Sequence, residues 1–352
     1  MPYIIIFSCV FILGVFDYIS FNQYPIIVLG KHRYRIDFFY WLILALLLLA
    51  AWFRNPYWGP DSINYSGAYA AAARGNISSY EYGYILLQKL CVMFQLDYQG
   101  FTRVIAILMY PLLFLAYGKR NERSLLILSY VAMNYFDSFA IHRNYIACTF
   151  MLLAYDSYIE KKYKTACIFV IVACLFHNTT FIYIFLLLMS RKERGKKYWV
   201  SLVIIAAIIY ISDIYRIIFY LLGLINGRYL AYLAGLMDGA VPSRGSTIYT
   251  ILLLLALILS VLYQSRIDNS ECRILQNFLC YIAVFTIFFP WFPNYSRVIR
   301  VSFVLIAILV SETIHVMKQT NRRITVFMYS LILFVAMYFN QGFFLMEGMF
   351  SK

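Results

Sequence analysis

Long apolar runs that alternate with short basic stretches are the feature of this sequence that most restricts its fold. Hydrophobic residues make up 63% of the chain and charged residues 13%, so no segment is left for a separate water-soluble domain. An apolar run of about 17 to 25 residues can cross a bilayer as a helix. We therefore predict an all-α integral membrane protein, with one polytopic membrane domain over residues 1–352.

The basic stretches predict which ends of the helices face the cytoplasm, because cytoplasmic loops are enriched in Lys and Arg. Five such stretches occur, at residues 31–35, 119–123, 161–164, 191–197 and 318–323. The apolar runs around them predict helices over residues 3–16, 37–53, 101–117, 124–136, 141–159, 198–211, 247–263, 274–289, 298–316 and 324–339. With short and broken helices included, we expect roughly 11 to 13 transmembrane segments. Residues 3–30 could hold one long crossing or two short ones.

Two segments do not fit simple crossings. Residues 82–96 lie between helices that already leave and re-enter the cytoplasm, so we expect a helix at the outer interface there. Residues 165–189 have basic stretches at both ends but only about one helix of length, which predicts two half-helices meeting near His177. The same topology places loops 54–81, 212–246 and 290–297 on the outer side.

Composition also excludes several classes of function. The net charge of +14 comes from Lys and Arg between apolar runs, so topology rather than nucleic acid explains it. The seven cysteines form no CxxC pair, and we find no glycine-rich nucleotide loop and no DxD pattern. We therefore expect no disulfide framework, no metal and no cofactor. The 33 tyrosines exceed what interfacial belts require, and some are expected to line a wet cavity.

The first outer loop carries the charged residues Arg54, Asp61, Arg74 and Glu81. Two carboxylates near cations suit acid and base chemistry or recognition of sugar hydroxyls. The alternative is an interfacial loop whose charges are simply solvated.

Arg143 begins a helix at the outer side, between His142 and Asn144. Its guanidinium could bind a phosphate with two hydrogen bonds, or it could extend to lipid headgroups. His142 lies beside a loop and is expected to be a solvated surface residue. His177 differs because apolar sequence surrounds it, and ionisable groups inside membranes are usually functional. It could act as a base, an acid or a hydrogen-bond donor to phosphate, or it could cap the helix break.

Arg297 and Arg300 lie three residues apart at a helix start, with Tyr295 just before them. Two guanidinium groups on one face of a helix N-terminus form an anion site, although lipid headgroups could also be their partners. Three further arginines extend the outer positive charge as secondary candidates: Arg216, Arg228 and Arg244. The sum of these features indicates an outward-facing cavity for a phosphate-bearing, hydroxyl-rich ligand such as a lipid-linked sugar.

Four parts of the sequence resemble the EpsG and Wzy-like family of polysaccharide polymerases. An outer Asp is followed by Tyr and then by an acidic residue before a helix, matched by Asp61, Tyr65 or Tyr69, and Glu81. A helix opens on an R-(Q/N)-x-(I/L)-A pattern, matched by Arg143, Asn144, Ile146 and Ala147. Phe176 and His177 form the Phe-His centre of a broken apolar segment. A late loop-to-helix segment carries arginines, which Tyr295, Arg297 and Arg300 resemble.

The resemblance implies a GT-C-like fold in the bacterial inner membrane and a metal-independent glycosyltransferase. Such an enzyme moves a growing glycan from one polyprenyl pyrophosphate to another lipid-linked repeat unit at the outer face. It implies catalytic roles for Asp61, Glu81 and His177. The same resemblance implies pyrophosphate binding by Arg143, Arg297 and Arg300, with secondary substrate contacts from Tyr65, Arg74 and Tyr295. The partners it implies are membrane lipid, lipid-linked glycans and a chain-length regulator.

Rival functions stay open at this point. A flippase or exporter of lipid-linked oligosaccharide would also need a cationic, aromatic cavity, although we find no internal repeat of the kind transporters show. A membrane-bound acyltransferase would use a catalytic histidine, and His177 beside Asn178 is compatible with that role.

Overall fold

The computed structural model describes residues 2–20, 26–29, 32–35, 38–59, 61–76, 80–120, 122–192, 194–212, 217, 220–221, 224, 244–263, 270–288 and 295–340. The chain divides into two compact units, Met1–Phe181 with Ser311–Lys352, and Ile182–Val310. We describe each unit by itself.

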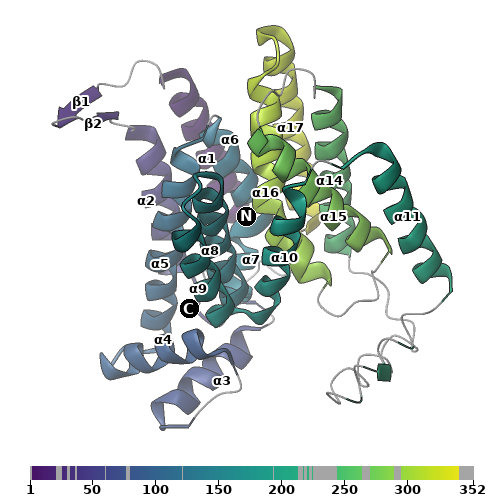
Figure 1. Cartoon of the computed structure of the whole chain (residues 1–352). Helices are drawn as coiled ribbons and strands as arrows, with labels where there is room; N and C mark the ends of the chain where they lie inside the picture. The colour runs from purple at the N-terminus through teal and green to yellow at the C-terminus, as the bar shows by residue number, and fades with distance from the viewer. Residues whose placement is uncertain are drawn as a thin grey trace. The chain divides into compact units, whose positions relative to one another are not determined.

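Unit 1 is a helical bundle with one short hairpin (Figure 1). Its helices are α1 (Pro2–Ser20), α2 (Phe38–Phe53), α3 (Ser62–Ala73), α4 (Tyr82–Met93), α5 (Tyr98–Gly118), α6 (Arg123–Tyr130), α7 (Asp137–Ala140), α8 (His142–Ile159), α9 (Tyr163–Phe176) and α17 (Gln319–Asn340). The prediction of a helical fold is confirmed. The hairpin is a departure from it, because β1 (Ile26–Leu29) and β2 (His32–Arg35) pair antiparallel, with β2 inside the first basic stretch.

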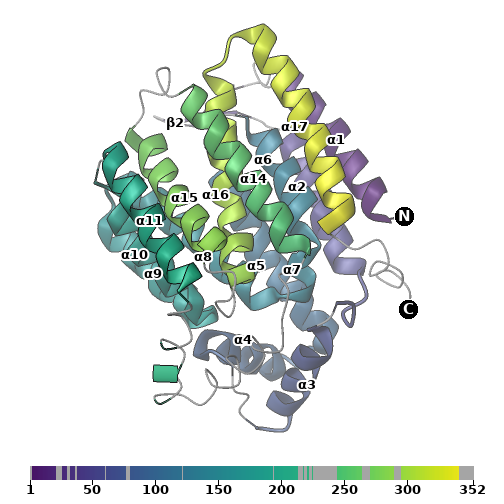
Figure 2. The same cartoon turned by 90° about the vertical axis from the view of Figure 1, so that its right-hand side faces the viewer.

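Unit 2 contains α10 (Phe181–Ser190), α11 (Lys196–Ile211), α14 (Arg244–Leu262), α15 (Ser270–Phe288) and most of α16 (Tyr295–His315). Figure 2 shows α15 between α11 and α14, and both of these helices contact it. The Tyr198 and Tyr281 hydroxyls lie 2.9 Å apart between α11 and α15. A pair of hydroxyl groups therefore joins these two helices.

Two further predicted features differ from the structure in unit 1. The loop expected at 54–81 contains helix α3, whose sequence SINYSGAYAAAA is rich in alanine, the strongest helix former. The single helix expected at 124–136 is instead α6 followed by a π-helical turn, Val131–Tyr135. Such turns displace the residues that follow them around the helix axis, and functional sites often contain them.

One described helix, Tyr98–Gly118, is long and apolar enough to cross a membrane, with 21 residues and a mean hydropathy of 1.6. Six shorter apolar helical stretches accompany it in the described part of the chain: Ile5–Asp17, Phe38–Phe53, Tyr163–Phe176, Lys197–Ile209, Ile248–Leu262 and Ser302–His315. The expected number of crossings therefore stays a prediction.

Fully buried tyrosines are prominent in the core of unit 1. Their hydroxyls donate to carbonyl groups of other helices, as from Tyr40 to Phe114 O and from Tyr135 to Leu47 O, each at 2.6 Å. A buried hydroxyl needs such a partner, and in an apolar bundle a backbone carbonyl provides one. Part of the unusual tyrosine content is thus explained by links between helices rather than by a wet cavity.

Basic residues near the turn before α6 are paired rather than free. Arg123 donates two hydrogen bonds to the buried carboxylate of Asp17 on α1, at 2.8 and 3.1 Å. Arg120 pairs with Asp156, and Glu122 pairs with Arg322 at the start of α17. The predicted cytoplasmic arginines therefore also hold α1, α6, α8 and α17 together.

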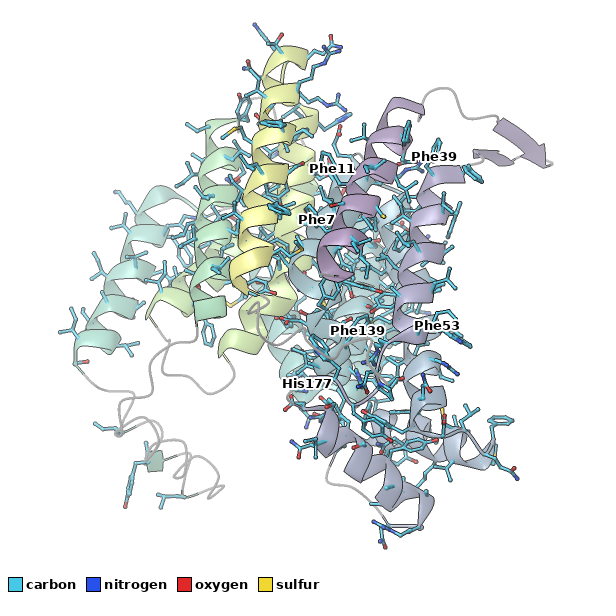
Figure 3. The ribbon with its side chains drawn as sticks, turned by 180° about the vertical axis from the view of Figure 1, so that it is seen from behind. Phe7, Phe11, Phe39, Phe53, Phe139 and His177 are labelled. Atoms are coloured by element: carbon cyan, nitrogen blue, oxygen red, sulfur yellow. The ribbon has the colours of Figure 1, made fainter. Side chains whose placement is uncertain are left out.

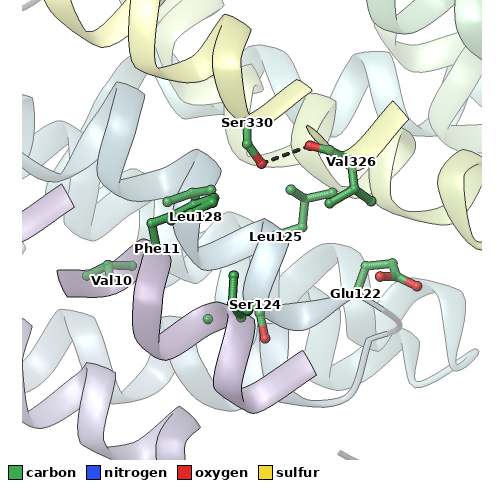
Figure 4. Close-up of a pocket in the computed structure, with 10 residues that line it drawn as sticks. Val10, Phe11, Glu122, Ser124, Leu125, Leu128, Val326 and Ser330 are labelled. Carbon is green, nitrogen blue, oxygen red and sulfur yellow. Dashed lines mark hydrogen bonds between the residues drawn. The ribbon is translucent and has the colours of Figure 1, made fainter. Parts of the chain in front are cut away.

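A small cavity of about 90 Å³ lies among α1, α6 and α17, close to this turn (Figure 4). Its lining is largely apolar, including Val10, Leu125 and Leu128, while Ser330 donates its hydroxyl to Val326 O at 2.8 Å. Ligand sites for drug-sized molecules usually exceed about 300 Å³. This cavity is too small to hold a glycan.

Candidate functional site

Three segments that are distant in sequence meet at one end of unit 1. Helices α3 and α4 lie across the ends of α5 and α9, and α9 packs along α8 (Figure 1). His177 lies toward this same end, together with Phe53 and Phe139, whereas Phe39 lies toward the other (Figure 3). The first outer loop, the start of α8 and the break after α9 therefore converge.

The break after α9 is a change of backbone conformation at His177. This residue is extended, with φ −156° and ψ 113°, and α10 begins only at Phe181. The Thr180 hydroxyl donates to His177 O at 2.6 Å. Asn and Thr favour such local bonds over a continuous helix. The polar residues 177–180 thus end α9 and place the imidazole of His177 at the site.

Gly83 allows α4 to approach the end of α9. A Cβ at this position would lie only 2.8 Å from Leu175 O and 2.9 Å from Leu175 Cβ. Any residue with a side chain would push the two helices apart. Close packing here brings Glu81, just before α4, next to His177.

The Glu81 carboxylate is the centre of the site and is shared between two partners. Its Oε2 accepts a hydrogen bond from the Arg143 guanidinium, and its Oε1 lies 3.1 Å from His177 Nδ1. The backbone N–H of Asn178 also points to Oε1, at 3.4 Å. The side chains of Glu81, Arg143 and His177 are 11%, 15% and 6% exposed, so solvent screens these contacts little.

These contacts fix the protonation of Glu81. Burial by itself would raise the pKa of this carboxyl, but the hydrogen bond from His177 and the charge of Arg143 outweigh burial and lower the pKa to about 2. Glu81 is therefore ionised at neutral pH and can only accept hydrogen bonds.

The ionised carboxylate in turn determines the state of the imidazole. Because Glu81 only accepts, His177 must donate its Nδ1–H, and in the neutral ring Nε2 then carries the lone pair. Nε2 is buried and has no hydrogen-bond partner in the described part of the chain. The lone pair on this atom is the proton-accepting position of the neutral ring.

Tyrosines surround the guanidinium of Arg143. Its central carbon lies 4.1 Å from the ring centroid of Tyr80, 5.7 Å from that of Tyr65 and 5.9 Å from that of Tyr84. The three rings also contact one another, with centroids 5.6 to 5.7 Å apart. Aromatic faces hold a cation in place. No local pattern in the sequence singles out Tyr80 or Tyr84.

Two further buried residues, His142 and Arg54, pack next to Tyr65. The ring of Tyr65 stacks on His142, with centroids 5.0 Å apart and planes 20° apart. Arg54 lies 3.1 Å from Nε2 of His142 and is equally buried. The expectation of a solvated His142 is wrong, because it is only 1% exposed. The turn before α8 folds inward against the first outer loop, which sequence spacing cannot show.

The remaining candidates in the first outer loop differ in position. Asp61 is half-buried before α3, and its negative charge raises the pKa of Tyr65 and Tyr80 as a smaller effect than burial. It therefore lies close to the site. Arg74 is exposed at the far end of α3, a helix length away.

Six predicted ligand-binding residues cannot be placed at the site. Arg216 and Arg228 lie outside the described residues. Arg244 begins α14, and Tyr295, Arg297 and Arg300 begin α16, but their side chains also lie outside the described part of the structure. Across the residues that are described, no group of three or more His, Cys, Asp or Glu could hold a metal ion.

Comparison with known proteins gives one match. The model of the EpsG family matches residues 37–347, which includes every element of the site described above. No curated protein and no solved structure matches the chain.

Proposed function

Because the chain belongs to the EpsG family, we propose that it is a polysaccharide polymerase of the Wzy type. It transfers a growing glycan from polyprenyl pyrophosphate to a lipid-linked repeat unit. The observation that carries this proposal is the ionised Glu81 between Arg143 and His177, next to the cluster of three tyrosines around Arg143. This arrangement combines a proton acceptor for the attacking hydroxyl with a cation for the phosphate leaving group, and the aromatic rings add surfaces on which a sugar can pack.

The proton acceptor is His177. An acceptor hydroxyl attacks the anomeric carbon of the donor, and the new C–O bond forms as the bond to pyrophosphate breaks. The hydroxyl proton passes to Nε2, and Glu81 stabilises the imidazolium through Nδ1–H. The electron pair of the broken bond leaves with the polyprenyl pyrophosphate.

The cations balance this leaving charge without a metal. Arg143 is held by Glu81 and the tyrosine rings, so its direction is fixed before substrate binds. Arg297 and Arg300 contribute as further pyrophosphate ligands at the N-terminus of α16, where the helix dipole favours anions. Arg216, Arg228, Arg244 and Tyr295 remain secondary substrate contacts in this proposal.

Asp61 is the alternative group for the acceptor hydroxyl. It is half-buried and close enough to act on Tyr65 and Tyr80, so it could orient the sugar that approaches His177. Tyr80 is part-exposed and offers a ring face to the same sugar, whereas the buried Tyr65 holds Arg143 in place. Under this proposal Glu81 orients His177, and Asp61 orients the acceptor.

The exposed surface of the helices supports a membrane setting. Large apolar side chains are exposed along α11, including Ile204, Ile208 and Ile211, the last of which is 80% exposed. Such surfaces need lipid or protein cover. We place the enzyme as a multi-pass GT-C-like protein in the bacterial inner membrane, acting at the outer face, with a chain-length regulator as a partner.

The test is the glycan produced by cells that carry only a variant enzyme. His177→Ala is expected to lower polymer at least about 100-fold, the usual minimum for loss of a positioned proton acceptor. Arg143→Ala is expected to lower it about 100-fold as well, through loss of charge stabilisation, and both variants should keep their membrane abundance. His315→Ala is the matched control, because His315 is 45% exposed beside Glu122, away from the site. Long glycan in both site variants would refute the proposal.

Lipid-linked intermediates measured in parallel separate the rival function. A polymerase defect leaves single repeat units on the outer side of the membrane. Accumulation of repeat units on the cytoplasmic side would show that the protein is a flippase.

A further inference from the structure

Arg54 is a buried cation at the end of α2 that the proposed reaction does not use. It is 3% exposed, and its guanidinium lies 4.5 Å from the ring centroid of Phe139. One nitrogen donates to Phe139 O at 3.5 Å, and the other lies 3.1 Å from Nε2 of His142. Phe139 of α7 and His142, the first residue of α8, thus hold one side chain of the first outer loop.

The contact with His142 defines the tautomer of that histidine. A guanidinium has donors but no acceptor, so Nε2 of His142 must accept the bond. The ring is then neutral, with its proton on Nδ1. This is the less common tautomer of a free histidine side chain, so it is a distinctive signature of the pair.

The charge of Arg54 has no carboxylate to balance it. No ion pair involves Arg54 in the part of the chain that the structure describes, and its titratable neighbours are mainly tyrosines: Tyr84, Tyr98, Tyr110 and Tyr135. A buried cation without a counter-ion is costly for folding. Arg54 is separated from Arg143 only by His142 and Tyr65, so we consider a role in the reaction rather than in folding stability.

A chain of ring contacts leads from Arg54 to the site. His142 stacks on Tyr65, and the ring of Tyr65 lies 5.7 Å from the central carbon of Arg143. Tyr65 is 4% exposed and packed on both sides. A ring held in this way has one orientation, and so does the guanidinium beside it.

We propose that Arg54 and His142 are a positioning pair, in which Arg54 locks the Nδ1–H tautomer of His142 and thereby fixes Tyr65 against Arg143. This role rests on the proposed polymerase function. Neither residue touches the substrate. Both act through Tyr65 on the cation that faces the leaving group.

The tautomer can be measured without any reaction. We suggest ¹⁵N NMR of histidine-labelled protein in lipid nanodiscs, with His142 assigned by comparison with His142→Phe. The expected spectrum shows His142 as the neutral Nδ1–H form between about pH 6 and pH 8, where a free histidine would titrate. A protonated ring, or the Nε2–H form, would overturn the proposal.

Kinetics separate a positioning role from a structural one. Arg54→Met is expected to lower kcat at least tenfold with little change in KM, because the misplaced Arg143 acts mainly on the transition state. Arg54→Lys, which keeps a charge and a donor, should recover part of kcat. Arg103→Met is the matched control, since Arg103 also lies over an aromatic ring, Trp52, at 4.7 Å and donates to Trp52 O, yet lies outside the site.

The outcomes distinguish the two proposals. An unchanged kcat in Arg54→Met, together with loss of the Nδ1–H form, would overturn the positioning role. If Arg54→Met fails to fold, Arg54→Lys takes its place. A wild-type kcat in Arg54→Lys, together with loss of the Nδ1–H form of His142, would then overturn the positioning role. A wild-type protein without polymerase activity would refute the proposed function, while the tautomer spectrum would still decide whether Arg54 bonds to His142.

Discussion

Replacing Glu81 with glutamine should destabilise unit 1, because this change removes the anion that Arg143 and His177 share. The lowering of its pKa from 4.5 to about 2 corresponds to about 3 kcal/mol of folding free energy at neutral pH. The side chain is only 11% exposed, so solvent removes little of this contribution. Glutamine keeps the shape and leaves the guanidinium without its counter-charge.

The effect has a defined dependence on pH. The pKa of Glu81 is lower in the folded than in the unfolded chain, so its contribution is complete above about pH 4.5 and is lost as the pH falls toward about 2. The difference between the wild type and Glu81→Gln should therefore be largest at pH 7 and shrink over this acidic range.

Unfolding of the detergent-purified protein, followed by tryptophan fluorescence at several pH values, measures both quantities. Glu160→Gln is the control, since Glu160 is 40% exposed and pairs with Lys119 and Lys162 at the surface, where such pairs contribute roughly 0 to 1 kcal/mol. Equal stability of Glu81→Gln and the wild type at pH 7 would refute the reasoning. So would a difference that persists unchanged from pH 4.5 to pH 2.

Three further variants test other parts of the structure. Gly83→Ala should cost about 1 to 3 kcal/mol, since its Cβ would meet Leu175 O at 2.8 Å; an unchanged unfolding temperature would contradict the close approach of α4 and α9. Asp17→Ala removes the carboxylate that accepts two hydrogen bonds from the buried Arg123 and should cost about 3 to 5 kcal/mol, which denaturant titration measures; a loss below about 1 kcal/mol would show that the pair is not structural. Arg297→Ala should reduce polymer about tenfold or more at normal abundance, as expected for loss of a charged hydrogen bond to pyrophosphate, and normal chain length on a gel would exclude that role.

Local sequence was enough to predict the helical fold and most helices. Apolar runs set where α2, α5 and α8 lie, because burial of nonpolar side chains dominates helix placement in such a chain. The polar letters after Phe176 interrupt an apolar helix, and the backbone leaves helical geometry there. Local composition failed for α3, where tyrosines and glycine obscured a helix rich in alanine.

The sequence by itself also nominated Glu81, Arg143 and His177, because charged groups in apolar surroundings stand out one at a time. Only the tertiary structure shows that the three side chains touch, 62 and 96 residues apart along the chain. Tertiary structure alone also reveals Arg54 and His142, whose burial depends on how the first outer loop folds against the turn before α8. The physical reason is that protonation, tautomer and charge balance are properties of neighbours in space, which sequence spacing does not encode.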